Sequence, residues 1–98
     1  MEFLVRLEVT VPDSLGQDEW SALLASEAEE GRRRLAAGVL LRIWRIPGAF
    51  ANYSLYQATD ATELHELLAS LPLHRWMTAE VTALARHPLE EPAVTSPL

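Results

Sequence analysis

The chain contains no cysteine and no lysine among its 98 residues. Without cysteine it can form no disulfide, no thiolate nucleophile and no cysteine-ligated zinc site. Without lysine it can form no Schiff base and has no lysine general base, so all eight basic residues are arginines. Reactions and metal sites that depend on cysteine, and reactions that depend on lysine, are therefore excluded.

Positive charge and long hydrophobic runs are also scarce. The net charge is −6, which argues against a nucleic-acid partner because phosphate binding depends on cationic side chains. No apolar run approaches the roughly 20 residues that cross a bilayer, and the first residues alternate like a strand rather than forming a secretion signal. We therefore expect a soluble, cytoplasmic protein without a membrane segment.

The three histidines, His65, His74 and His87, match no spacing of a metal motif. The chain also has no glycine-rich phosphate loop, no nucleophile elbow and no Ser/His/Asp arrangement. We therefore expect no metal site.

The order of predicted elements is strand, helix, strand, strand, helix, strand. The elements are expected at residues 3–11, 19–37, the two arms of a hairpin within 39–57, 60–71 and 74–85. This order predicts an α+β fold of the ferredoxin-like βαββαβ type, with two helices on one face of an antiparallel sheet. We expect one domain over residues 1–88 and an extended C-terminal tail over residues 89–98.

Capping residues and charge pairs refine the two helices. Asp18 and Asp60 are predicted to begin them, and Gly38 to end the first. The predicted apolar face of the first helix consists of Trp20, Leu23, Leu24, Ala28 and Leu35. The run 32–34 is all arginine and follows three glutamates, which predicts a solvated, salt-bridged helix face, with an anion-binding patch as the alternative.

A sheet with helices on one side leaves its other face open. Five aromatic residues are too many to leave exposed on a monomer of this size: Trp44, Phe50, Tyr53, Tyr56 and Trp76. We expect sheet-to-sheet dimerisation of the α+β-barrel type, or a larger ring.

The hairpin carries an unusual number of polar side chains. Strand alternation places Arg42 and Trp44 on one face and Arg45 on the other, while Asn52 and Ser54 share a face of the partner strand. A guanidinium beside amide and hydroxyl groups suits a carboxylate ligand, so these five are candidate substrate-binding residues. The alternative is an arginine paired with Glu8, Glu27 or Glu80.

Two residues are candidate catalytic groups. Glu27 is in helical register with Leu23 and Leu24, and a buried carboxylate with raised proton affinity makes a plausible base. It is equally a common salt-bridge partner. His74 begins the last predicted strand, a rim position where a titrating group can meet a ligand.

Several motifs together resemble one known family, the muconolactone delta-isomerases, from Phe3 to Pro88. They are Trp44-Arg45-Ile46, Gly48, Ala51-Asn52-Tyr53-Ser54, Leu64-His65, Leu71-Pro72-Leu73 and Arg86-His87-Pro88. The resemblance implies a cofactor-free isomerase with the ferredoxin-like fold, assembled into dimers and decamers. Such enzymes move a proton between carbons of an unsaturated lactone bearing a carboxylate, in bacterial catabolism of catechol-type aromatics by the beta-ketoadipate route.

The chain departs from that family pattern at four places. Ala28 stands where the family has lysine, Leu41-Arg42-Ile43 replaces Arg-His-Leu, Ala49-Phe50 replaces His-Tyr, and His74-Arg75 replaces Phe-Pro. The resemblance therefore implies muconolactone or a related substrate, including a lactone of secondary metabolism. Two other functions stay open: a non-catalytic oligomeric binding module for a small acidic aromatic or lactone metabolite, and a structural oligomer.

Overall fold

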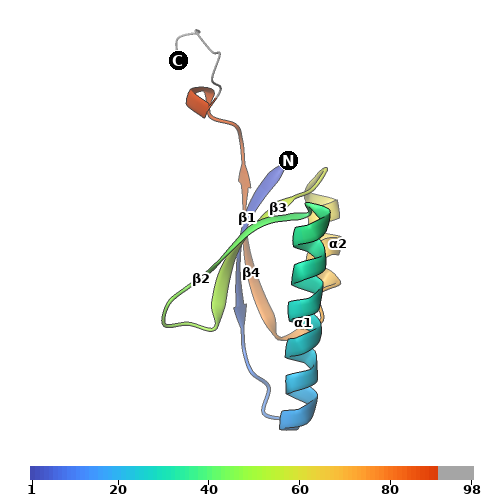
Figure 1. The fold of residues 1–98 in the computed structure, drawn as a ribbon. Helices are drawn as coiled ribbons and strands as arrows, with labels where there is room; N and C mark the ends of the chain where they lie inside the picture. Colours follow the sequence, from blue (N-terminus) through green and yellow to red (C-terminus); the bar gives the residue numbers. More distant parts are fainter. Residues whose placement is uncertain (91–98) are drawn as a thin grey trace.

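A four-stranded antiparallel sheet with two helices on one face forms the body of the computed structural model, which describes residues 1–90 (Figure 1). The strands are β1 (Glu2–Val9), β2 (Leu40–Arg45), β3 (Ala51–Gln57) and β4 (Met77–Leu84), in the spatial order β2-β3-β1-β4. The helices are α1 (Gln17–Ala37) and α2 (Ala61–Ala69), and two 3₁₀ turns are η1 (His74–Trp76) and η2 (Pro88–Glu90). This confirms the predicted ferredoxin-like fold.

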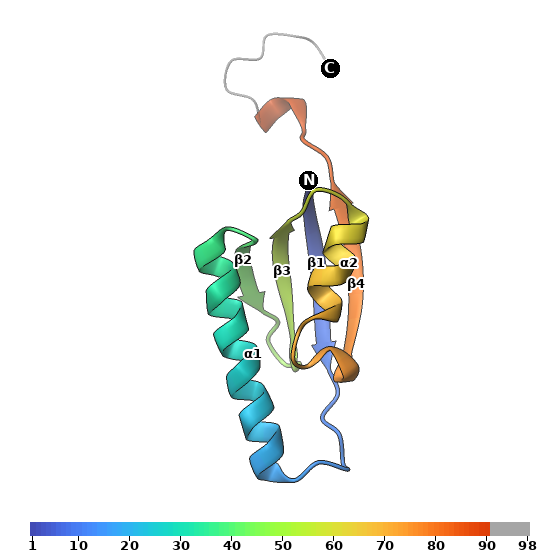
Figure 2. The same cartoon turned by 90° about the vertical axis from the view of Figure 1, so that its right-hand side faces the viewer.

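The helices divide one face of the sheet between them. In Figure 2, α1 runs along the β2 side of the sheet, while α2 lies over β1 and β4.

No helix within residues 1–90 has the length and apolar character needed to cross a membrane. The predicted extended tail begins instead with the η2 turn, and residues 91–98 lie outside the described part.

The hydrophobic core lies between the sheet and the helices. Alternate β1 residues, Phe3, Val5 and Leu7, point toward the helices and are at most 3% exposed. Leu64 and Leu68 of α2, four residues apart on one helix face, pack onto them. Each such fully buried side chain contributes roughly 1.5–3 kcal/mol to the stability of the fold. Every second residue of the strand and every third or fourth residue of the helix faces the other element, which brings these side chains together in the core.

The hairpin is confirmed, and it contains a bulge that the sequence did not reveal. Gly48 adopts φ 84° in the turn, a conformation that glycine tolerates without strain. Leu40 pairs with Tyr56, but Arg42 pairs with Leu55, so Leu41 is an extra residue in β2. Each side chain after Leu41 therefore points to the opposite face of the sheet from the one it would have in a regular strand.

The helix ends agree with the predictions in two cases of three. Asp60 accepts a hydrogen bond of 2.8 Å from the Glu63 amide, and Gly38 ends α1 at φ 75°. The predicted cap at Asp18 is wrong, because α1 begins earlier, after Gly16. Asp18 instead lies in the first turn, where a carboxylate interacts favourably with the helix dipole.

The predicted inner face of α1 is wrong near its C-terminal end. Leu35 is 42% exposed, whereas Arg34 is only 5% exposed. Steps of three and four residues from Trp20 through Glu27 lead to position 34 rather than 35, so the helix turns an arginine toward the sheet. The solvated salt-bridged face is confirmed for Arg33, which pairs with Glu29 at 3.5 Å and also with Glu30.

Two strand predictions extend too far. Residues 74–76 form η1 rather than the start of β4, because the chain must turn after Pro72 to enter the sheet. Val11 is 50% exposed and lies beyond the end of β1.

The open face of the sheet carries fewer aromatics than predicted. Cross-strand partners Trp44 and Tyr53 lie there, 40% and 38% exposed. Tyr56 is instead buried under the helices, at 2% exposure. Phe50 lines a cavity at the hairpin end, and Trp76 packs edge-on against Trp20 of α1 at 5.7 Å between ring centroids.

Candidate functional site

Three of the predicted substrate-binding residues share the helix-facing side of the hairpin. Ile43 pairs with Ser54, and Arg45 pairs with Asn52. Ser54 is 2% exposed, and its hydroxyl donates a 2.7 Å hydrogen bond to Oδ1 of Asn52. Since that bond occupies the amide oxygen, the amide nitrogen of Asn52, which has no partner within residues 1–90, is left to donate to a ligand.

A cavity of about 270 Å³ adjoins these residues. Its lining combines apolar side chains with one arginine and one amide: Val9, Ile43, Arg45, Phe50, Ala51 and Asn52. The volume lies just below the usual range for small-molecule sites, roughly 300–1,000 Å³. An apolar wall beside a guanidinium and an amide suits a small organic acid that also carries a carbonyl group.

The predicted catalytic Glu27 is half-buried on the inner side of α1. Its Oε1 accepts a 3.1 Å hydrogen bond from the backbone amide of Leu73, in the connection between α2 and η1. Burial raises the pKa of the Glu27 carboxyl, while the Leu73 amide and the charge of Arg34 oppose the rise. A carboxyl held in place, with its proton affinity raised, is suited to both removing and returning a proton.

The other predicted catalytic residue, His74, follows Leu73 directly but is exposed on η1. The structure thus brings Glu27 and His74 to the same connection. Glu27 is bonded to it, and no hydrogen bond joins the two side chains within residues 1–90. The prediction that His74 lies at the start of a strand is wrong, since it belongs to a 3₁₀ turn.

Arg42 and Trp44 are separated from the other three substrate-binding candidates. They lie on the open face of the sheet, where the Arg42 guanidinium is 4.9 Å from the centre of the Trp44 ring. The bulge at Leu41 causes this separation, because without it Arg42 would stand opposite Ser54. The alternative pairing with glutamate is also not seen: in residues 1–90 the open-face ion pair is Arg6–Glu8 at 2.9 Å, and neither Arg42 nor Arg45 forms one.

One polar cluster was missed by the sequence reasoning. Arg34 donates to Oε2 of Glu30 at 2.7 Å, to the Tyr56 hydroxyl at 3.2 Å and to the Ser70 hydroxyl at 2.9 Å. The signal was present, since Glu27, Glu30 and Arg34 follow one another at three- and four-residue spacing. The run of three arginines instead led to the prediction that all of them face solvent.

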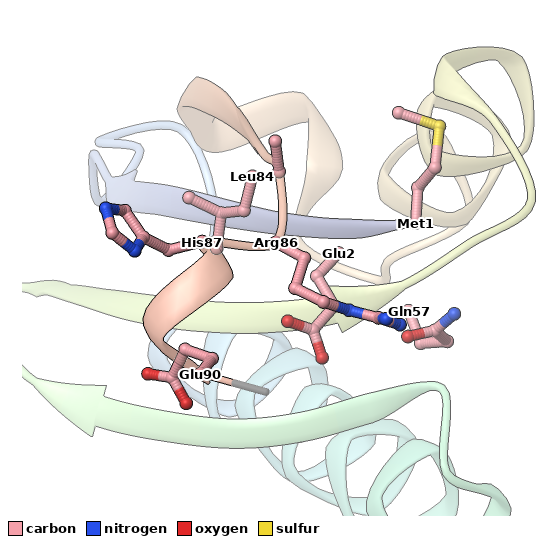
Figure 3. Close-up of a pocket in the computed structure, with 8 residues that line it drawn as sticks. Met1, Glu2, Gln57, Leu84, Arg86, His87 and Glu90 are labelled. Atoms are coloured by element: carbon pink, nitrogen blue, oxygen red, sulfur yellow. The ribbon is translucent and has the colours of Figure 1, made fainter. Parts of the chain in front are cut away.

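A larger cavity, about 630 Å³, lies between the end of the sheet and η2 (Figure 3). Arg86 extends there toward Gln57, while His87 accepts a 3.1 Å hydrogen bond at Nδ1 from the Leu89 amide. None of the predicted catalytic or substrate-binding residues lines it. Among residues 1–90 no group of three or more histidine and carboxylate side chains is placed to hold a metal ion. The smaller cavity, which Arg45 and Asn52 line but Glu27 and His74 do not, is therefore the candidate substrate-binding site.

A sequence model of the muconolactone delta-isomerase family matches residues 1–90. The chain belongs to this family.

Curated muconolactone delta-isomerases of bacteria are similar over most of their length. Muconolactone Delta-isomerase 1 of Acinetobacter lwoffii is 38% identical over 88 residues, which cover 90% of this chain and 92% of the relative. The Pseudomonas aeruginosa Muconolactone Delta-isomerase is 36% identical with the same coverage. A crystal structure of muconolactone isomerase superimposes with a TM-score of 0.83 at 33% identity, covering 99% of this chain and 97% of the other. The fold and the family resemblance are thus confirmed by sequence and by structure.

Proposed function

We propose that the protein is a cofactor-independent isomerase that moves a proton between carbons of a small unsaturated lactone bearing a carboxylate. Its membership of the muconolactone delta-isomerase family over residues 1–90 is the observation that supports this most directly. Muconolactone in bacterial aromatic catabolism is the first substrate to test, and a related lactone of secondary metabolism is the second. The reaction would take place in the cytoplasm.

The proton transfer is assigned to Glu27. Its ionised carboxylate takes a proton from a ring carbon, and the C–H electron pair enters the conjugated system as a dienolate. The same carboxyl returns the proton to another carbon of that system, so the double bond shifts with no net gain of protons or electrons. The half-buried position of Glu27 and its bond to the Leu73 amide support this role.

Substrate orientation is assigned to the cavity side of the hairpin. Arg45 would hold the substrate carboxylate, and the free amide nitrogen of Asn52, held by Ser54, would donate to the lactone carbonyl where negative charge develops. His74 is the alternative acid/base group.

The open sheet face is assigned to packing against a second copy of the chain, in a dimer or decamer. Trp44, Tyr53 and Arg42 would lie in that contact, since exposed aromatics favour association. Residues 1–88 would form the folded domain and residues 89–98 its tail.

Incubation with muconolactone in deuterated water tests the function. We expect isomerised product that carries deuterium to the extent that the Glu27 carboxyl exchanges its proton with solvent before returning it. We also expect loss of turnover by about 100-fold or more in Glu27→Gln, and little loss in His74→Ala. Saturable binding without turnover would favour the non-catalytic binding module instead, and the reverse order of the two variants would transfer the acid/base role to His74.

A further inference from the structure

Arg34 and Ser54 are the polar residues among those buried in residues 1–90, and Arg34 alone is charged. Its guanidinium donates to groups from α1, from β3 and from the end of α2, namely Glu30, Tyr56 and Ser70. A buried charge is costly unless its donors are paired, and here all three kinds of guanidinium nitrogen have a partner. The cation thus joins α1 to β3 and to the end of α2.

Arg34 and Glu27 act on the same short connection. Arg34 binds the Ser70 hydroxyl at the start of residues 70–73, and Glu27 binds the Leu73 amide at their end. The two side chains are seven positions apart on α1, which is two helical turns, and Glu30 lies between them on the same inner side. Movement of the cation would therefore disturb the segment that positions the Glu27 carboxyl.

The charged and titratable groups around Glu27 come from α1, from β3 and from the connection between α2 and η1. On α1 they are Arg34 and Glu30, and on β3 the titratable group is the Tyr56 hydroxyl. The connection contributes the uncharged Leu73 amide and Ser70 hydroxyl, with His74 exposed beyond it. Arg34 favours the ionised carboxylate of Glu27, and Glu30 disfavours it.

We propose that Arg34 is a positioning residue for the isomerisation, which fixes the connection that holds Glu27 and keeps this half-buried carboxyl able to ionise. Glu30 opposes the charge of Arg34, so the pair sets the pH at which Glu27 takes up a proton. This inference rests on the proposed role of Glu27 in proton transfer.

Two variants with opposite expected effects test it. In Arg34→Met the acid limb of the pH profile of kcat/KM should move to higher pH, and in Glu30→Gln it should move to lower pH. Each pH unit of displacement changes kcat/KM on that limb about tenfold. Arg32→Gln, an exposed arginine of the same helix, is the control and should leave the limb where it is. Carbon-13 NMR of the Glu27 carboxyl follows the same titration without substrate.

Loss of thermal stability in Arg34→Met with unchanged pH profile and unchanged Glu27 titration would overturn the inference and leave Arg34 a structural residue. If Arg34→Met does not fold, Glu30→Gln decides by the direction of its displacement. If Glu27→Gln retains full activity, the proposed function loses its acid/base group, whereas the NMR titration still shows whether Arg34 controls Glu27.

Discussion

The backbone amide of Leu73 donates a 3.1 Å hydrogen bond to Oε1 of Glu27, joining two residues that are 46 positions apart. A side chain that could have remained in water is instead half-buried and bonded to the segment that leads into β4. Burial raises the pKa of Glu27 despite that bond, so the folded protein holds the Glu27 proton more tightly than the unfolded chain does.

The first prediction concerns stability in Glu27→Gln. Because the folded pKa is raised, the contribution of Glu27 to stability is fully present below its unfolded pKa and is lost as the pH rises through the folded pKa. Glutamine keeps an acceptor for the Leu73 amide without the charge. The variant should therefore have a higher Tm than the wild type at about pH 7, with the difference vanishing near pH 4. Glu29→Gln, exposed on the same helix, is the control, and a lower Tm for Glu27→Gln at neutral pH would contradict the prediction.

The second prediction compares the two hairpin arginines. Arg45→Gln should raise KM for a carboxylate substrate by roughly 10-fold or more, because a hydrogen bond to a charged group contributes about 1.5–3 kcal/mol. Arg42→Gln, on the opposite face, should leave KM nearly unchanged in steady-state assays. An increase of KM in Arg42→Gln alone would place the carboxylate on the open face.

The third prediction concerns the buried hydroxyl of Ser54. Ser54→Ala removes the 2.7 Å bond that fixes Asn52, at a cost of roughly 1 kcal/mol in the free energy of unfolding. Since Asn52 then turns more freely, kcat/KM should fall several-fold. Chemical denaturation and steady-state kinetics measure the two effects, and Ser26→Ala on the exposed side of α1 serves as control. Unchanged kinetics in Ser54→Ala would show that Asn52 needs no such support.

The fourth prediction concerns the open sheet face. Trp44→Glu combined with Tyr53→Glu places two like charges on neighbouring strands, which a sheet-to-sheet contact cannot accommodate. The double variant should sediment at a smaller mass than the wild type. Leu35→Glu, on an exposed apolar position of α1, should not change the mass. Equal masses for wild type and double variant would exclude this face as the contact.

Most of the fold could be predicted because local signals agree with one another. The alternation of the first strand, the hairpin within residues 39–57 and the Asp60 cap of α2 each depend on a few neighbouring residues, and the structure confirms all three. The side of α1 that carries Arg34 was not predicted, because two of the three partners that stabilise it, Tyr56 and Ser70, are distant in sequence and only Glu30 is local. The proximity of Glu27 to Leu73 depends on tertiary packing in the same way.

The bulge at Leu41 changes which residues of β2 face the helices, from even-numbered to odd-numbered positions. Ahead of it the even-numbered Leu40 is on the helix-facing side and buried, and after it the odd-numbered Ile43 and Arg45 are on that side, at the cavity. Deleting Leu41 would close the bulge and leave Arg42 opposite Leu55 and Arg45 opposite Asn52. If β2 instead paired regularly with Leu41 retained, Arg42 would turn to the cavity side and Arg45 to the open face, so the extra residue decides which of the two arginines reaches the cavity.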